Sequence, residues 1–281
     1  MAIIKIGNRE IAPLFMAGLR SLVASVCLYI WSRIRGMILF PSKIVVLHGA
    51  VVGLFFGAEF GLIYVGLEYT LTSRVYVMLY TAPFFAALGA HFFLKNDRLN
   101  SWKAAGLLLA FCGVVATFVK NLGSFSFTAL PGDLMVLAAG ALWAFTTVYI
   151  KKYLSALISP LQTLFYQVFF SAPLLFLMSF TLEDTVISGF SVLTCFSVFY
   201  QCIVVAFLSY LVWFELIHRY PISLLHAFSF FTPVLGVLLS GILIMGETIG
   251  LNLIIALILV SLGMILVNYQ PPVKSVSLSE S

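Results

Sequence analysis

The strongest constraint on the fold of this chain is an internal repeat with a fixed offset of 150 residues. The segment 73–118 returns as 223–268, with no gap inside either copy. Each copy holds an apolar run with one proline near its middle, a polar hinge with one acid, and a second apolar run with a late glycine. A repeat of this length means that the chain consists of two related halves. The corresponding residues are Ser73 and Ser223, Pro83 and Pro233, Asp97 and Glu247, and Gly113 and Gly263.

The composition places both halves in a membrane. Hydrophobic residues make up 62% of the 281 residues and charged residues 9%, and the mean hydropathy is +1.13. A soluble protein of this composition would have far too little polar surface. The net charge of +5 is then explained by membrane topology, and no nucleic-acid partner is expected.

The apolar runs are long and continuous, which predicts α-helices and not the alternating strands of a barrel. A helix needs ~20 apolar residues to cross a bilayer, and the turns between the runs are too short for a separate soluble domain. We therefore expect an all-α, polytopic membrane helix bundle. Complete spans are predicted at residues 11–31, 44–67, 74–94, 102–119, 132–150, 160–180, 191–214, 222–245 and 251–269.

The start of the chain predicts a partial first helix. Residues 1–7 are apolar apart from Lys5, but too few residues precede Pro13 for a full span at ~1.5 Å per residue. In the second half, a complete span ends at Lys151, and Pro160 follows Lys151 much as Pro13 follows Lys5. We therefore expect a first helix truncated by roughly 15 residues, followed by nine complete ones. A signal peptide is the alternative, but no A-x-A site follows Lys5.

The positive charges predict the orientation. With the partial helix counted first and its N-terminus cytoplasmic, ten lysines and arginines lie on the cytoplasmic side and three lie outside. Trp31, Trp102 and Trp213 are predicted at cytoplasmic helix ends, where indoles anchor at the interface. The C-terminus is then cytoplasmic, and the expected location is the plasma membrane, in a bacterium the inner membrane. The cytoplasmic charges are Arg33, Arg35, Lys43, Lys95, Arg98, Lys103, Lys151, Lys152, Arg219 and Lys274, and the outer ones are Arg9, Arg74 and Lys120.

Five spans in each half have a topological consequence. A repeat with an odd number of spans enters the membrane from opposite sides in its two copies. The first repeat, residues 1–119, and the second, residues 131–269, should therefore form an inverted-topology pair, with a polar, disordered cytoplasmic tail at 270–281. Such pairs are typical of transporters, in which the two halves exchange conformations around a site at the membrane midplane.

Five segments of the chain carry a resemblance to a known family, and they are KIGNREIAPLFMAGLR, LYTAPFFAALGAHFFLKNDRL, GDLMVLAAGALWAFTTVYIKK, RYPISLLHAFSFFTPVLGVLLSGILIMGETI and ALILVSLGMILVNY. Over nearly its whole length the chain resembles the drug/metabolite transporter superfamily, in particular the EamA-type ten-helix exporters. It lacks the tryptophan-containing segment that usually begins the family's first helix. The resemblance implies a secondary transporter that exports small metabolites such as amino acids, purines or drugs by alternating access. We expect a small-molecule substrate and membrane lipid as partners, no cofactor, and a monomer or weak homodimer.

Two ionisable residues are predicted deep in the membrane. Arg20 lies about 13 Å from the outer end of its helix, and Glu59 lies about 12 Å from the outer end of the next one. A charge near the bilayer centre is costly, so both side chains should face the bundle interior. They either pair or share a water-filled cavity, in which Glu59 is the candidate for proton coupling. A structural salt bridge between them is the alternative.

Several aromatic and polar residues are candidates for a substrate cavity. Trp143 lies well inside its helix, where its indole N–H needs a partner or a cavity. Tyr76 and Tyr80 share one helix face, and His226 replaces Tyr76 in the second copy. A cavity lined by aromatics with few charges suits amphipathic or partly apolar metabolites. Ordinary helix packing is the alternative for each. The remaining candidates are Tyr149, Gln167, Tyr200, Gln201 and Tyr210.

Glycines and prolines indicate packing faces and hinges. A stripe of glycines every fourth residue on the third helix predicts close packing against another helix, and Gly113 and Gly263 are assigned the same role. Pro83 and Pro233 each free a backbone carbonyl one turn earlier, so we hypothesise that they are rocking hinges. Asp97 and His91 are interpreted as solvated residues at the interface. The stripe consists of Gly49, Gly53, Gly57 and Gly61.

Other functional classes find less support in the sequence. There is no HExxH, GxSxG or Walker A motif, which disfavours an intramembrane enzyme or an ATP-driven pump. A nucleotide-sugar or organophosphate exchanger of the same superfamily would need several intramembrane cations, and only Arg20 and Lys5 qualify. A non-transporting scaffold would need no intramembrane charges. The cysteines lack metal-ligand spacing and are read as buried hydrophobes, so no metal is expected; they are Cys27, Cys112, Cys195 and Cys202.

Overall fold

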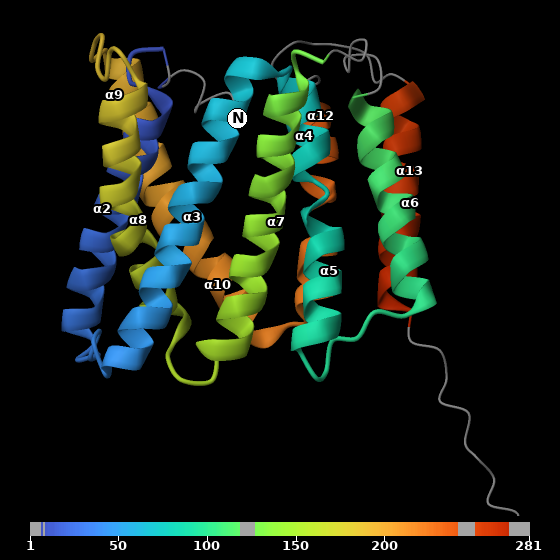
Figure 1. Ribbon diagram of the computed structural model, residues 1–281, viewed down its shortest axis with the longest axis horizontal. Helices are drawn as coiled ribbons and strands as arrows, with labels where there is room; N and C mark the ends of the chain where they lie inside the picture. The colour runs from blue at the N-terminus through green and yellow to red at the C-terminus, as the bar shows by residue number, and fades with distance from the viewer. Residues whose placement is uncertain (1–6, 8, 119–126, 241–250, 270–281) are drawn as a thin grey trace, which may run out of the picture.

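The structure is a computed structural model that describes residues 7, 9–118, 127–240 and 251–269. Within these ranges every regular element is a helix, and the one strand-like pairing is an isolated bridge between Ile11 and Ile187. Figure 1 shows the helices standing side by side as a bundle. The all-α prediction is confirmed. The predicted tail at 270–281 lies outside the described residues.

The helices of the first half are α2 (Pro13–Ile34), α3 (Lys43–Tyr69), α4 (Thr72–Leu79), α5 (Ala82–Phe93) and α6 (Ser101–Phe118). Those of the second half are α7 (Leu130–Tyr153), α8 (Pro160–Leu182), α9 (Val192–Phe199), the π-helix η2 (Tyr200–Ser209), α10 (Tyr210–Arg219), α11 (Ile222–Phe228), α12 (Phe231–Ser240) and α13 (Leu251–Asn268).

Seven of the described helical spans are long and apolar enough to cross a bilayer, counting α4–α5 and α9–η2–α10 as single spans. They coincide with the first seven complete spans predicted from the sequence. The last two predicted spans contain shorter apolar helices in their described parts, Ile222–Leu235 and Ile254–Asn268. The chain is thus a polytopic membrane bundle, and the inverted relation of its halves stays a prediction.

Capping residues explain where several helices begin. The Ser159 hydroxyl accepts a hydrogen bond from the Gln162 backbone N–H, and the Gln162 side chain accepts one in return from the Ser159 N–H at 2.8 Å. This capping box precedes Pro160, whose fixed φ suits the first turn of a helix. At the starts of α3 and α9 the Ser42 and Ser191 hydroxyls each accept one backbone N–H, without a bond in return.

The two repeated spans that carry Pro83 and Pro233 are each broken just before that proline, whereas α8 stays continuous through Pro173. The first breaks at Tyr80–Thr81, ahead of Pro83, and separates α4 from α5. The second breaks at residues 229–230, ahead of Pro233, and separates α11 from α12. A proline lacks the N–H that would bond one turn back, and its ring crowds the carbonyl there. The breaks therefore follow from the sequence, and the hinge function remains a prediction.

The span 192–219 contains a feature that the sequence did not predict. Its middle, η2, is a π-helix of 10 residues. A π-helix widens the turn by one residue, and short π segments inside α-helices are frequent at functional sites. No proline or glycine in 200–209 announces it.

The glycine stripe of α3 packs against α8. Each of its glycines lies against one α8 side chain, and these side chains also recur every fourth residue. A Cβ added at Gly53 would lie 2.5 Å from the Cβ of Phe170, so only glycine fits there. The pairs are Gly49 and Tyr166, Gly53 and Phe170, Gly57 and Leu174, and Gly61 and Met178.

The helices α6 and α13 form a second close pair, seen at the right of Figure 1. Gly263 of α13 lies against the Gly106 carbonyl, and Gly113 of α6 lies against the Ala256 carbonyl. A Cβ at Gly113 would come within 2.9 Å of that carbonyl oxygen. Small residues thus allow the two backbones to approach closely.

Two acidic residues connect the halves at the end where α2 begins. The Glu183 carboxylate accepts the backbone N–H groups of Leu14 and Phe15 at 2.7 and 3.1 Å. Glu10 accepts the backbone N–H of Ser191 at 2.7 Å. The hydrogen bond from Ser191 lowers the pKa of Glu10 below its usual range. Each carboxylate therefore supplies acceptors to the first turn of a helix in the other half.

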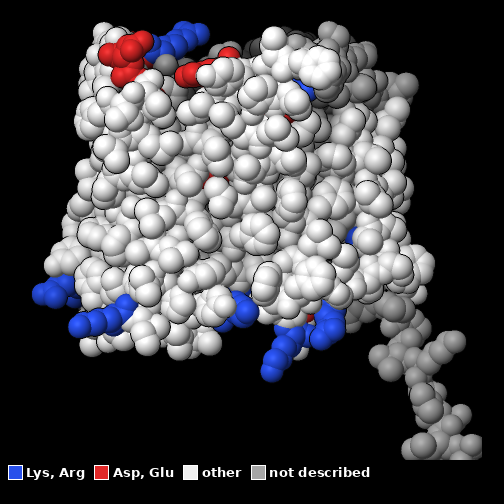
Figure 2. Space-filling view, in the orientation of Figure 1, with Lys and Arg blue, Asp and Glu red and all other residues white. Residues whose placement is uncertain are grey.

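Charges gather at the two ends of the bundle. Figure 2 shows acidic side chains with a few basic ones along the upper edge, mainly basic side chains along the lower edge, and a wide, almost uncharged band between them. Such a band is what a lipid-facing surface requires.

Two of the cysteines lie on the surface: Cys112 and Cys195 are exposed, so their predicted burial is wrong. In a membrane bundle an apolar residue can face lipid as well as the core.

Candidate functional site

A cavity of about 1020 Å³ lies between the two halves. It is lined by residues of α2, α3 and α4 from the first half and of α7, α8, η2, α10, α11 and α12 from the second. Its lining runs from Leu67 and Thr72 at one end of the bundle to Ile150 and Tyr220 at the other. The volume lies at the upper end of the range for small-molecule sites, ~300 to 1,000 Å³.

Arg20 enters this cavity from α2. The residue is 4% exposed, and its guanidinium carbon lies 4.5 Å from the centroid of the Phe60 ring. Its Nε and Nη2 atoms have no hydrogen-bond partner in the part of the chain that the structure describes. One face of the guanidinium is therefore covered by an aromatic ring, while the Nε and Nη2 donors remain unused among the described residues.

Glu59 enters the same cavity from α3. It is 7% exposed, and its Oε2 atom has no hydrogen-bond partner among the described residues. No Arg20 nitrogen lies within 4.0 Å of a Glu59 oxygen within the described ranges. Of the two arrangements that the sequence allowed, the described structure has a shared cavity and not a salt bridge.

An aromatic wall flanks the two charges. Phe56, Phe60 and Tyr64 follow one another on α3, with ring centroids 4.8 and 6.1 Å apart. Tyr210 of α10 closes against Phe56 at 5.9 Å, edge to face. The sequence predicts Tyr210 but not the α3 aromatics; the available signal was their own spacing of four residues, which places Phe56, Phe60 and Tyr64 along one side of the helix.

A second wall contains two tryptophans. Trp143 of α7 and Trp213 of α10 line the cavity with ring centroids 6.0 Å apart. Both pack against the fully buried His226, whose Nε2 lies 2.9 Å from the hydroxyl oxygen of Thr147. His226 lies behind this wall. The prediction of Trp213 as an interfacial anchor is wrong, because η2 and α10 carry the helix past residue 214 to residue 219.

Three more predicted residues line the cavity: Tyr76, Tyr80 and Gln167. Tyr76 stacks on Phe118 at 5.3 Å, and Gln167 is 5% exposed.

Two other candidates for the substrate cavity lie elsewhere in the bundle. Tyr149 bonds through its hydroxyl to Nδ1 of His48 at 2.6 Å, and Tyr200 begins η2; neither is among the lining residues. Gln201 is buried and donates to Ser197 at 3.2 Å.

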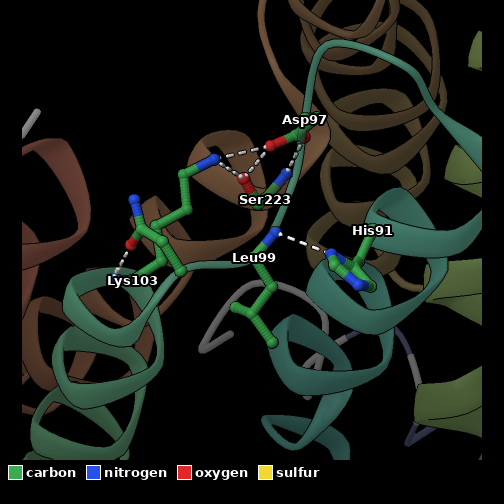
Figure 3. Close-up of polar contacts among 6 residues, drawn as sticks. His91, Asp97, Leu99, Lys103 and Ser223 are labelled. Atoms are coloured by element: carbon green, nitrogen blue, oxygen red, sulfur yellow. Dashed lines mark hydrogen bonds and ion pairs between the residues drawn. The ribbon is translucent and has the colours of Figure 1, made fainter. Parts of the chain in front are cut away.

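A polar cluster fastens α11 to the first half (Figure 3). Asp97, in the loop between α5 and α6, accepts the Ser223 backbone N–H and the Lys103 ammonium, each at 2.8 Å, and also the Ser223 hydroxyl. The Leu99 N–H donates to Nδ1 of His91 at 3.2 Å and fixes the same loop. Asp97 is 4% exposed, so its reading as a solvated residue is wrong. The sequence did offer one sign that Asp97 has a structural role, because the other copy of the repeat has an acidic residue, Glu247, at the same position.

Polar contacts at both ends of α7 join it to neighbouring helices. At one end the Asp133 carboxylate is paired with Arg74 of α4 and accepts the Thr70 hydroxyl at 2.7 Å. At the other end the Lys151 ammonium donates to the carbonyls of Ile217 and His218 at 2.8 and 2.7 Å. The latter bonds satisfy carbonyls in the last turn of α10, which have no partner within their own helix.

Comparison with solved structures supports this fold. A crystal structure of another protein superposes with a TM-score of 0.80 over 95% of this chain and 91% of that chain, at 22% sequence identity. Similarity at that identity establishes the fold alone.

Curated relatives are transporters. The uncharacterized transporter YoaV of Bacillus subtilis is 26% identical over 260 residues, 92% of this chain and 88% of that protein. A probable amino-acid metabolite efflux pump of Salmonella typhimurium is 26% identical over 258 residues, covering 88% of this chain and 82% of the pump. A pump of the same description from Escherichia coli K12 is 24% identical over 268 residues, 92% of this chain and 87% of its own.

The family assignment comes from matches in both halves of the chain. The model of the EamA-like transporter family matches residues 1–119 and, a second time, residues 130–269. The chain therefore belongs to the EamA-like transporter family of the drug/metabolite transporter superfamily, and it is a multi-pass membrane transporter and not an enzyme.

Proposed function

We propose that this transporter exports small amphipathic metabolites, of an amino acid-like, purine-like or drug-like kind, across the plasma membrane. The observation that carries the proposal is the cavity between the halves, where one buried arginine and one buried glutamate lie among aromatic rings. Arg20 is the one lysine or arginine among the described lining residues. A phosphate-bearing substrate would need more cations, whereas a largely apolar compound fits this lining.

Alternating access is the transport mechanism that we propose. The two repeats are taken to be inverted copies that rock around the cavity and open it to one side at a time. The polar contacts of α11 and α7 support this view, because they join elements of different halves or spans at the bundle ends. The charge distribution supports a cytoplasmic C-terminus.

Glu59 is the proposed site of proton coupling. A carboxylate that is buried in the cavity and lacks a salt-bridge partner among the described residues can take up and release a proton as the cavity changes its exposure. The substrate's own gradient is the alternative driving force. The names of the Salmonella and Escherichia relatives support efflux as the direction.

The experiment is substrate-stimulated proton flux in proteoliposomes that contain the full chain. We expect flux with the unmodified protein and none with Glu59→Gln. Glu68→Gln is the matched control, since Glu68 lies on the same helix but is exposed near its end. Substrate movement that needs no proton flux and survives Glu59→Gln would refute the coupling and retain the exporter. No movement of any amino acid, purine or cationic drug would refute the exporter.

A further inference from the structure

We infer that His91 is a positioning residue that makes the attachment of α11 depend on pH at one end of the bundle. As a neutral imidazole, His91 holds the loop between α5 and α6, and this loop carries Asp97, to which α11 is bonded. Protonation of His91 releases the loop and, through Asp97, the start of α11. The inference concerns regulation of the cavity wall, and only its effect on transport rests on the proposed function.

The first step is the direction of one hydrogen bond. The Leu99 backbone N–H donates to Nδ1 of His91 at 3.2 Å (Figure 3). A backbone N–H can only donate, so Nδ1 carries a lone pair, and the proton of the neutral ring lies on Nε2. A protonated imidazole has an N–H on both nitrogens and no acceptor. The hydrogen bond between Leu99 and His91 therefore exists only while His91 is neutral.

The second step is what this hydrogen bond holds in place. His91 lies in the last turn of α5, and the loop that follows runs from Leu94 to Asn100, the residue before α6. Within this loop the Leu99 N–H is tied back to His91, and Asp97 lies two residues before Leu99. The side chain of Leu99 also packs against the buried cluster that joins α5, α6, α11 and α13. The bond to His91 thus fixes the backbone that positions the Asp97 carboxylate.

The third step leads from Asp97 to the cavity. The Asp97 carboxylate accepts the Ser223 N–H and the Lys103 ammonium, each at 2.8 Å, and Asp97 is 4% exposed. Ser223 lies in the first turn of α11, where backbone N–H groups have no acceptor within their own helix. Helix α11 contributes Leu225 and Phe228 to the cavity lining. A displaced Asp97 therefore leaves one wall of the cavity without its attachment.

The charged groups around His91 offer it no free carboxylate. Asp97 is already paired with Lys103 and bonded to Ser223. Protonation of His91 therefore removes the bond to Leu99 without providing an acid as a new partner among these groups. The titratable side chains at this end on the loop, on α6 and on the two helices that pack against α5, α7 and α11, are Lys95, Asp97, Arg98, Lys103, Tyr149, Lys151, Lys152, Tyr153 and His226.

Hydrogen exchange of the purified full chain in detergent tests the inference without a substrate. The protection of the Leu99 and Ser223 amides, corrected for the intrinsic effect of pH on exchange, is compared at about pH 7.5 and 5.5, because histidine ordinarily changes charge in this range. We expect both amides to lose protection about fivefold at the lower pH, the ratio that corresponds to one hydrogen bond. Unchanged protection of Leu99 would overturn the inference, and a loss at Leu99 with none at Ser223 would overturn its extension to α11.

Substitutions of His91 distinguish a titrating switch from a merely structural contact. In His91→Asn the side-chain oxygen replaces Nδ1 as the acceptor and does not titrate, so protection should stay high at both pH values. His91→Phe keeps a ring without an acceptor, so protection should be low at both.

His48→Asn is the matched control. His48 lies at the same end of the bundle, near the start of α3, and its Nδ1 bonds to the Tyr149 hydroxyl at 2.6 Å. This variant should keep the pH response of the unmodified chain. A pH response that persists in His91→Asn, or one that is lost in His48→Asn, would assign the response to another group and overturn the inference.

Transport connects the switch with the proposed function. With ethidium, adenine and phenylalanine as probes in proteoliposomes, acidifying the His91 side should slow the unmodified chain severalfold, because α11 no longer holds its part of the cavity wall. His91→Asn should not show this slowing. Any pH dependence that comes from proton coupling is common to both proteins, so their difference isolates His91. Equal slowing of both would overturn the regulation of transport by His91. No movement of any probe would refute the proposed function, and hydrogen exchange alone would then decide on the switch.

Discussion

The carboxylate of Asp97 accepts two hydrogen bonds from Ser223, one from its backbone N–H at 2.8 Å and one from its hydroxyl. Asp97 belongs to the first half of the chain and Ser223 opens α11 in the second, so this contact joins the halves at the end of the bundle opposite to the start of α2 (Figures 1 and 3). Helix α11 in turn supplies Leu225 and Phe228 to the cavity.

Replacing Asp97 should release α11. Asp97→Ala leaves the Ser223 N–H and the Lys103 ammonium without their acceptor, and we expect a loss of about 1 to 3 kcal/mol in unfolding free energy. Thermal unfolding in detergent measures the loss. The exposed Asp184→Asn is the control and should unfold like the unmodified chain. An Asp97→Ala protein as stable as the control would mean that the contact is not formed.

The packing of α3 on α8 predicts a strong cost for a small change. Gly53→Ala places a Cβ 2.5 Å from the Cβ of Phe170, inside the contact distance of two carbons. Overpacking of this kind costs about 1 to 3 kcal/mol. Phe170→Gly in the same chain removes that Cβ and should recover part of the loss, which a double-mutant cycle would measure. Additive effects of the two substitutions would contradict the packing.

The fold could be predicted largely because lipid simplifies the sequence signal. Each complete span is an apolar run closed by polar turns. The starts at Ser42 and Ser159 carry recognisable side-chain caps, and Pro13 marks the first turn of α2. The π-helical turns of η2 could not be predicted, because they depend on packing against other helices and leave no local mark such as proline or glycine. The exposure of Cys112 also escaped prediction, since hydropathy does not distinguish lipid from core.

The candidate site was partly predictable for a related reason. A charge in the membrane must face the interior, so the matching depths of Arg20 and Glu59 predicted that they either pair or share a cavity, and both line the same cavity. An aromatic side chain, by contrast, can face lipid, the packed core or the cavity. Trp143 lines the cavity while Tyr149, less than two turns further along α7, packs on Tyr153 at 4.7 Å. Which face of a helix meets the cavity is decided by tertiary contacts.

The ion pair between Arg74 and Asp133 should contribute to stability at the end of the bundle where α7 begins. Their side chains are 13% and 6% exposed, and Asp133 also accepts the Thr70 hydroxyl. Asp133→Ala leaves a nearly buried guanidinium alone, and we expect a loss of about 3 kcal/mol in unfolding free energy.

The double substitution Arg74→Met with Asp133→Leu is the informative comparison. It removes both charges, so unfolding in detergent should show it more stable than Asp133→Ala alone. If both proteins lose the same unfolding free energy, the unpaired Arg74 charge does not cause the loss in Asp133→Ala. Arg219→Ala is a suitable control, because its pairing with Glu215 is exposed and contributes little.

The two broken helices make the hinge hypothesis testable. Pro83→Ala restores an N–H that can bond one turn back, and the same holds for Pro233→Ala, so each should favour a straighter helix across its break. If rocking of the halves uses these breaks, both variants should bind the substrate as before and transport it more slowly. Pro173→Ala is the control, since Pro173 lies inside α8, which is continuous from Pro160 to Leu182. Transport at an unchanged rate in both hinge variants would remove the prolines from the mechanism and leave the breaks as local consequences of the backbone.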